Sequence, residues 1–178
     1  IYQNPRSTGA AWERACSVEF IDPTGAEPGF AETCGIKVHG NSSRRPWRVQ
    51  KHGFGLEFRG SLGASSLRYR LFPDSKVEKF DEIVLRASFT DGWCLVSWDP
   101  GRYRPDDSLQ FRDVWAKNAH RDMGYLATRN RFVHLFINGL YWGLYNPCEH
   151  IDEKMIASQL GGLETDWEVV ADFVDPDA

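Results

Sequence analysis

The dipeptide Asn138-Gly139 and its surroundings constrain the fold more than any other part of the chain. Two largely apolar runs flank it, residues 132–137 and residues 140–145. A two-residue Asn-Gly linker is typical of a type I′ turn, whose central residues need the positive φ angles that Asn and Gly tolerate. The pattern therefore predicts a β-hairpin, and we expect Pro147 to end its second strand.

Short runs rich in β-branched, aromatic and aliphatic residues predict further strands in the first half of the chain. Gly, Pro, Asp and Ser bound these runs, as expected for strands that end in turns. The predicted strands are residues 17–21, 35–39, 54–58, 67–71 and 82–87, and residues 167–171 form one more candidate.

A helix is predicted over residues 109–123, with Asp107 or Ser108 as its N-cap and Gly124 as its stop. At 100° per residue an apolar arc forms, and aromatic residues at such spacing are usually core. The arc comprises Leu109, Phe111, Trp115, Ala116, Ala119 and Met123. Arg112 falls within it, so its guanidinium needs a carboxylate or phosphate partner.

Two smaller features complete the helix assignments. Asp113 and Lys117 are spaced to form an i,i+4 ion pair. A second helix is predicted over residues 152–160, with Asp152 at its start and Gly161-Gly162 closing it.

These elements predict the α+β class, a twisted antiparallel sheet with packed helices, forming a single unit over residues 1–178. With 178 residues, 42% of them apolar, the chain can bury a core of its own. No apolar run is long enough to span a membrane. Because the chain begins at Ile1 and ends in polar sequence, we expect it to be part of a longer protein.

The net charge of −4 argues against a nucleic-acid partner. The charge is distributed unevenly, since residues 36–72 carry +7 and residues 146–178 carry −8. These segments could be two solvated faces that attract each other, or the basic one could be a local anion site.

The four cysteines, Cys16, Cys34, Cys94 and Cys148, are widely spaced and form no CxxC motif. This spacing argues against a structural zinc site. An even number permits disulfides if the protein is exported, and the sequence does not decide between free thiols and bridges.

A polar turn, Gly40-Asn41-Ser42-Ser43, follows the predicted strand 35–39 and leads into Arg44, Arg45 and Lys51. Backbone N–H groups, hydroxyls and cations would meet there, which is the chemistry that phosphate binding requires. A solvated turn with surface cations is the alternative interpretation.

A long series of segments resembles the CotH kinase family, the relatives of spore-coat protein H, in order and spacing from about Cys16 to Val170. They are residues 36–44, 51–58, 71–75 and 80–87 with Asp91 and Trp93, then 111–114, 123–124 and 132–145, then Glu149 and Asp152.

The resemblance implies an atypical protein-kinase-like fold that binds ATP with Mg²⁺ or Mn²⁺ and phosphorylates Ser of secreted or coat proteins. This chain would be its small, nucleotide-binding lobe, at the cell surface, in the spore coat or outside the cell. By that analogy, the turn residues would hold phosphates and Lys51 would reach the α- and β-phosphates. The ATP-binding residues implied in this way are Gly40, Asn41, Ser42, Ser43, Arg44, Lys51, Arg112 and Glu149.

Arg112 would bridge to an acidic partner or to phosphate. Glu149 would lie where the lobes of a kinase meet, or would simply be an acidic group before a helix N-terminus.

The sequence also departs from the family. His39 stands where an arginine is common, and Gln50-Lys51 where two lysines are common. The family's catalytic base and metal-binding aspartates belong to a large lobe after this chain, so we expect no catalytic or metal-binding residue here and no kinase activity from these 178 residues alone.

Two alternatives stay open. One is a non-catalytic surface or spore-coat module that uses its seven tryptophans for binding. The other is a kinase-like enzyme that transfers a nucleotide rather than a phosphate.

Overall fold

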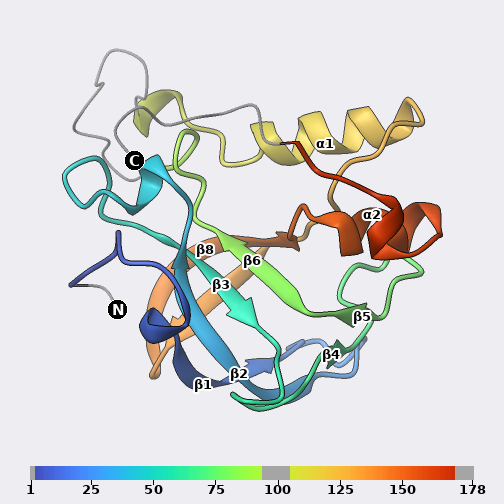
Figure 1. Cartoon of the computed structure of the whole chain (residues 1–178). Helices are drawn as coiled ribbons and strands as arrows, with labels where there is room; N and C mark the ends of the chain where they lie inside the picture. Colours follow the sequence, from blue (N-terminus) through green and yellow to red (C-terminus); the bar gives the residue numbers. More distant parts are fainter. Residues whose placement is uncertain (1–2, 94–104, 171–178) are drawn as a thin grey trace.

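A computed structural model describes residues 3–93 and 105–170 of the chain. These residues build a curled six-stranded sheet, antiparallel throughout, in the order β1-β2-β3-β6-β8-β7 (Figure 1). Its strands are β1 (Arg14–Phe20), β2 (Phe30–His39), β3 (Gly53–Glu57), β6 (Glu82–Arg86), β7 (Val133–Ile137) and β8 (Leu140–Glu149). A separate pair consists of β4 (Leu67–Arg68) and β5 (Lys79–Phe80). The α+β class expected from the sequence is confirmed.

The predicted hairpin is β7–β8, and Asn138 and Gly139 have φ angles of 50° and 78°. The expectation that Pro147 ends the second strand is wrong, because β8 runs on to Glu149 and pairs with β6. A strand residue's N–H and C=O point to the same side. The Pro147 carbonyl accepts from the Arg131 N–H, so pairing with β6 needs no N–H from the proline.

Several other boundaries differ from the prediction. The strands β1 and β2 begin earlier than expected, β4 covers only two residues of the predicted strand 67–71, and β5 was not predicted. Residues 167–170 form no strand, so that candidate is wrong over the part the structure describes.

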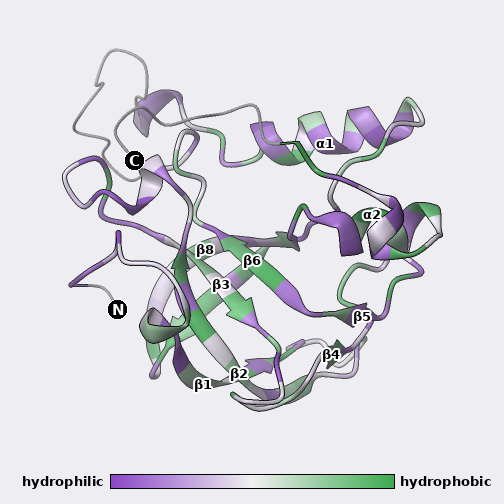
Figure 2. Cartoon of the chain, in the orientation of Figure 1, coloured by the Kyte–Doolittle hydropathy of each residue, from purple (hydrophilic) through white to green (hydrophobic). Residues whose placement is uncertain are grey.

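The hydrophobic core lies on one face of the curled sheet. Val38, Phe54, Leu56, Ile83 and Leu85 point from β2, β3 and β6 toward the segment that carries β4 and β5. From that segment Leu67, Leu71, Phe72 and Phe80 complete the core. Figure 2 shows the apolar colouring of β3 and β6.

The helices lie together at one end of the sheet (Figure 1). They are α1 (Arg112–Asp122) and α2 (Glu153–Leu160). The described residues also form four short 3₁₀ segments, which are η1 (Ala10–Trp12), η2 (Ser42–Arg44), η3 (Pro105–Asp107) and η4 (Glu164–Asp166). The predicted role of Asp152 is confirmed, since its carboxylate accepts from the Met155 N–H and caps α2.

The start of α1 differs from the prediction. Neither Asp107 nor Ser108 is the N-cap. Asp91 supplies the carboxylate instead, accepting from the backbone N–H groups of Leu109 (2.9 Å) and Arg112 (3.0 Å). A residue distant in sequence thus satisfies the N–H of Arg112, one of the groups that a helix start leaves unpaired, and also the N–H of Leu109 just before the helix.

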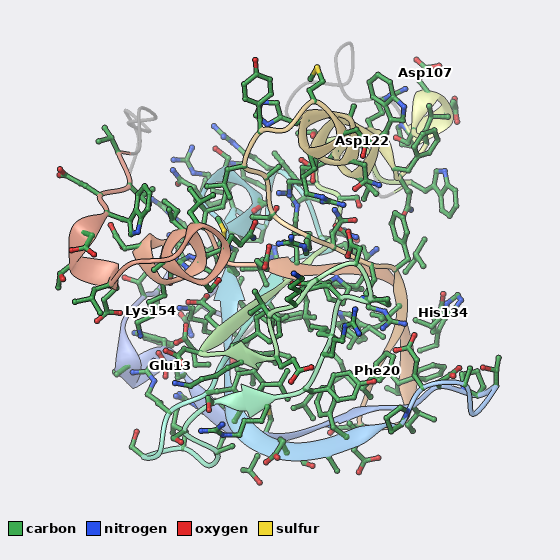
Figure 3. All side chains as sticks on the ribbon, turned by 90° about the vertical axis from the view of Figure 1, so that its right-hand side faces the viewer. Glu13, Phe20, Asp107, Asp122, His134 and Lys154 are labelled. Carbon is green, nitrogen blue, oxygen red and sulfur yellow. The ribbon has the colours of Figure 1, made fainter. Side chains whose placement is uncertain are left out.

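The apolar arc of α1 faces outward, so its assignment to the core is wrong. Trp115 is 65% exposed, and Leu109, Phe111 and Met123 are also exposed. Below the helix, the sheet presents polar residues such as Arg86 and Asn146, and the helix meets them with Asp113 and Lys117. Polar pairing therefore decides which side of α1 faces the sheet. Figure 3 shows η3 and α1, marked by Asp107 and Asp122, along the top of the molecule.

Within the described residues, no helix combines the length and the apolar character needed to cross a bilayer.

Candidate functional site

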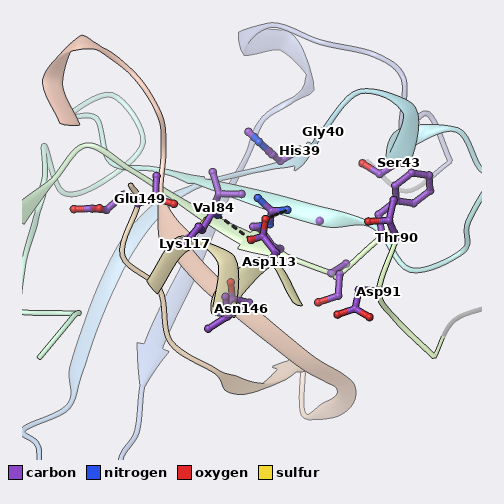
Figure 4. A pocket seen from close by; sticks show the side chains of 18 of the residues that line it. His39, Gly40, Ser43, Val84, Thr90, Asp91, Asp113, Lys117, Asn146 and Glu149 are labelled. Carbon is purple, nitrogen blue, oxygen red and sulfur yellow. Dashed lines mark ion pairs between the residues drawn. The ribbon is translucent and has the colours of Figure 1, made fainter. Parts of the chain in front are cut away.

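A cavity of about 430 Å³ lies between α1 and the polar face of β6 and β8, with the turn after β2 at its rim (Figure 4). Alternate residues of the two strands line its floor: Val84 and Arg86 from β6, and Asn146 and Cys148 from β8. Its volume lies within the range of small-molecule sites in proteins.

Two cations meet one carboxylate at the α1 side of the cavity. Lys117 Nζ lies 3.0 Å from Asp113 Oδ2, as the i,i+4 spacing predicted, and Arg86 Nη2 lies 3.3 Å from Asp113 Oδ1. Figure 4 draws Asp113 and Lys117 facing one another over Val84. Because one carboxylate serves two cations, this group carries a net positive charge that an anionic ligand can use.

The backbone is strained at the cavity wall. Among the described residues, three non-glycine residues have positive φ: Ser88 (55°), Gln110 (61°) and the hairpin residue Asn138 (50°). Ser88 and Gln110 both line the cavity. Such conformations cost about 1–3 kcal/mol each and cluster at functional sites.

Buried polar atoms at the cavity have no hydrogen-bond partner within the described chain. They are Gln110 Oε1, Thr128 Oγ1, Glu149 Oε1 and His150 Nδ1. Most buried polar atoms in proteins are paired, so these four atoms mark places where a polar ligand can bind.

Glu149, predicted from the resemblance, is one of these lining residues and is almost fully buried. Its Oε2 accepts from the Arg129 N–H and from Gln159 Nε2, both at 2.7 Å. Burial raises the pKa of this carboxyl, although the two hydrogen bonds and Arg129 oppose the rise.

The predicted phosphate-binding turn reaches the cavity in part. Gly40 and Ser43 line the rim, whereas Asn41, Ser42 and Arg44 are not among the lining residues. Gly40 has a φ of 117°, which side-chain-bearing residues rarely adopt, and a Cβ there would also press on Ser43 Oγ, so the turn favours glycine at this position.

Lys51 lies away from the cavity lining. Its Nζ donates to the Leu144 carbonyl at 2.6 Å and sits 4.5 Å from the centre of the Tyr145 ring. The predicted contact of Lys51 with ATP stays a prediction, and the structure does not bring this lysine together with Gly40, Ser43 and Glu149.

Arg112 has the acidic partner that the sequence predicted. Its Nη1 lies 3.0 Å from Asp91 Oδ1, and Asp91 lines the cavity. The guanidinium itself is about half exposed and is not among the lining residues.

A charged cluster that the sequence reasoning missed continues along the same sheet face. Lys37 on β2 forms an ion pair with Glu57 on β3, and its Nζ lies 3.5 Å from Glu82 Oε1 on β6. Burial works to lower the pKa of Lys37, but the two carboxylates raise it overall. Burial raises the pKa of Glu82. Lys37 and His39 are two residues apart on β2, so their side chains point to the same face of the sheet, and this spacing could have indicated that Lys37 lies on the cavity side.

Two histidines connect this cluster to the cavity. The rings of His39 and His150 meet edge to face at 5.7 Å, and both line the cavity. Their Nδ1 atoms each lie 3.7 Å from a Glu82 carboxylate oxygen. Burial, followed by the nearby His150 and Lys37 charges, lowers the pKa of His39 to about 4.

Over residues 3–93 and 105–170, no group of three or more His, Cys, Asp or Glu side chains is arranged to hold a metal ion. Asp91 and Asp113, the acids nearest the cations, are each engaged by arginine or lysine.

Comparison with protein families gives one informative result. A family model described as CotH kinase protein matches residues 36–173, which is most of the chain. The chain belongs to the CotH kinase family. The family resemblance inferred from the motifs is thereby confirmed. The match covers every cavity-lining residue of this CotH family member, from His39 to Ile151. No curated protein matches the chain.

Membership of the CotH family supports a kinase-like or spore-coat role for the chain.

Proposed function

We propose that the cavity beneath α1 binds the phosphates of ATP, and that the chain is the small, nucleotide-binding lobe of a CotH family protein kinase. One observation carries the proposal: Arg86 and Lys117 share the single carboxylate of Asp113 in a cavity that also holds unpartnered buried polar atoms. A polyanion requires cations and hydrogen-bond donors, and Arg86, Lys117 and the Thr128 hydroxyl can supply them here.

The distribution of charge suggests how the nucleotide lies. Lys117 and Arg86 would contact phosphate oxygens, and Ser43 at the rim would offer a hydroxyl beside the close-fitting Gly40. The buried polar atoms of Gln110 and Thr128 would face the sugar or the base. In this arrangement Lys51 supports the site indirectly by holding the Leu144 carbonyl of β8.

The described residues fit the phosphates better than they fit a resident metal ion, because no metal-ligand cluster is present among them. We therefore propose that Mg²⁺ or Mn²⁺ enters the site together with ATP. A divalent cation supplies charge neutralisation during phosphoryl transfer.

The chain's own contribution is positioning. Phosphoryl transfer depends mainly on holding the phosphates in place and stabilising their charge. Arg86 and Lys117 come from different elements, β6 and α1, and Asp113 fixes the separation of their charges. We propose that Ser side chains of secreted or coat proteins accept the phosphate, as the family resemblance implies.

The first test measures ATP binding by calorimetry, with Lys117→Ala compared with Lys76→Ala. Lys76 is an exposed lysine outside this cavity. We expect Lys117→Ala to weaken ATP binding at least tenfold and Lys76→Ala to leave it unchanged. Adenosine should bind both variants equally, because it lacks phosphates. Equal ATP affinity in wild type and Lys117→Ala would reject the site.

A further arm uses Lys51→Ala. If Lys51 contacts the phosphates, as the resemblance implies, this variant should lose as much affinity for ATP as Lys117→Ala. If Lys51 acts only through β8, ATP affinity should change little while the unfolding temperature falls.

The chemistry is tested with labelled ATP and a Ser-rich protein, using the whole protein that contains this chain. Transfer of label from the γ-phosphate supports the kinase. Transfer from the α-phosphate would show nucleotidyl transfer and would overturn the phosphorylation proposal.

A second candidate function, a binding module of the cell surface or spore coat, is favoured by one separate observation. Aromatic side chains are exposed on two elements, Phe111 and Trp115 near α1, and Phe136 and Tyr141 on the β7–β8 hairpin. Absence of any ATP binding by the chain would favour this second function.

A further inference from the structure

Two cysteines face each other across the edge of the sheet. Cys16 on β1 is the direct register partner of Cys34 on β2, and their Sγ atoms lie 3.6 Å apart. Directly opposed residues of antiparallel strands have Cα atoms about 4.5–5.5 Å apart, which lies inside the range that a disulfide spans. A bond between these sulfurs needs only a small side-chain rotation.

The two thiols differ in exposure in a way that suits oxidation. Cys34 is fully buried, whereas Cys16 on the edge strand is partly exposed and can be reached by an oxidant. The hydrogen bond from Cys34 lowers the pKa of Cys16 to about 7, although burial opposes the change. The same contact, together with burial, raises the pKa of Cys34. Cys16 is therefore the first nucleophile, since the thiolate is the reactive form.

We propose that Cys16 and Cys34 form an intrachain disulfide when the folded chain meets a low-molecular-weight disulfide oxidant. The Cys16 thiolate attacks one sulfur of the oxidant and expels the other as a thiolate. Cys34 then gives its proton to the thiolate already released and attacks the Cys16 sulfur of this mixed disulfide, expelling the second thiolate, which takes a proton from solvent. Two protein thiols are oxidised, and one external disulfide is reduced to two thiols.

The bond would fasten the edge strand β1 to β2. An edge strand has a neighbour on one side only, so it is the strand most easily lost from a sheet. The adjacent strand β2 carries Lys37 and His39 toward the candidate site. Formation of this disulfide does not depend on the proposed ATP site, because Cys16 and Cys34 are not among the residues that line the cavity.

The test incubates the purified chain with oxidised glutathione, blocks remaining thiols by alkylation and maps the peptides by mass spectrometry. We expect a peptide pair linked through Cys16 and Cys34, with a mass two hydrogens lower than the reduced pair. Cys148 is almost fully buried in β8, so its thiol should become alkylated only after the chain is unfolded.

The matched variant is Cys16→Ser, which removes the exposed partner. The unfolding temperature of the wild-type chain should rise on oxidation, and that of Cys16→Ser should not. Alkylation of both Cys16 and Cys34 after oxidation, or a link from either of them to Cys94 or Cys148, would overturn the proposal.

Discussion

His39 holds an uncharged imidazole in a charged neighbourhood. It lies between the Lys37 cluster and the His150 ring, and burial lowers its pKa from 6.5 to about 4. Below pH 6.5 the unfolded chain binds a proton on this ring that the folded chain does not bind until about pH 4. Stability contributed by His39 is therefore lost as the pH falls through this window.

We predict that the free energy of unfolding decreases from pH 7 to pH 4 by up to about 3 kcal/mol on account of His39. Urea titrations at a series of pH values measure this slope. His39→Gln, which cannot be protonated, should show a shallower slope. His52 has a pKa lowered by burial and contributes in the same direction, whereas Glu82 has a raised pKa and contributes in the opposite one. An unchanged slope in His39→Gln would contradict the assignment.

Individual residues were predictable where the signal is local. Asp152 was recognised as a helix start because its cap bond spans three residues. The Lys37, Glu57 and Glu82 cluster was missed, because its members come from three strands whose pairing the sequence did not establish. The need of Arg112 for an acidic partner was predicted, but Asp91 could not be named without the fold.

At the scale of the element, the start of α1 depends on one carboxylate. Asp91 accepts from two backbone N–H groups and pairs with the Arg112 guanidinium. We predict that Asp91→Ala destabilises the protein by about 1–2 kcal/mol, because it leaves a helix start unpaired. Urea unfolding checks the value. Asp106→Ala, an exposed aspartate in η3, serves as the control and should change stability by less than about 0.5 kcal/mol. Equal effects of the two variants would contradict the capping role.

The elements differ in how far the sequence determines them. The β7–β8 hairpin was predicted because its turn chemistry lies in two adjacent residues. The limits and the orientation of α1 were not predicted. The carboxylate that caps its start belongs to Asp91, 18 residues before Leu109, and the residues that face the helix, Arg86 and Asn146, come from the sheet. Periodicity locates a helix and its faces, but the surface below decides which face is turned inward.

At the scale of the whole molecule, the apolar residues divide into a core on one sheet face and an exposed group around α1. We predict that Trp115→Ser changes the free energy of unfolding by less than about 0.5 kcal/mol, since its side chain is 65% exposed. Phe54→Ala should cost about 3–5 kcal/mol, because Phe54 is 2% exposed within the core. Chemical denaturation of both variants tests the contrast. A large loss in Trp115→Ser would mean that the α1 face is covered in the folded chain.

The class of fold and most of the strands followed from the sequence, while the strand order β1-β2-β3-β6-β8-β7 did not. That order brings β6 and β8 side by side although more than 50 residues separate them, and the floor of the candidate site is made there. The sequence indicated the Asp113–Lys117 pair through its spacing and the Gly40–Ser43 turn through its chemistry, and the family resemblance added Glu149. The residues that β6 contributes to the floor could not be named without the strand order.

The dependence of α1 on Asp91 also bears on the order of events during folding. A helix of 11 residues is only marginally stable by itself in water. Its polar partners lie outside the helix: Arg86 in β6, Asp91 just after β6, and Asp74, which pairs with Arg121, between β4 and β5. The helix should therefore form after β6 and β8 have paired, and its amide hydrogens should exchange with solvent sooner than those of the central strands. The helix α1, which covers the cavity, is then the last part of the fold to form and the first to open.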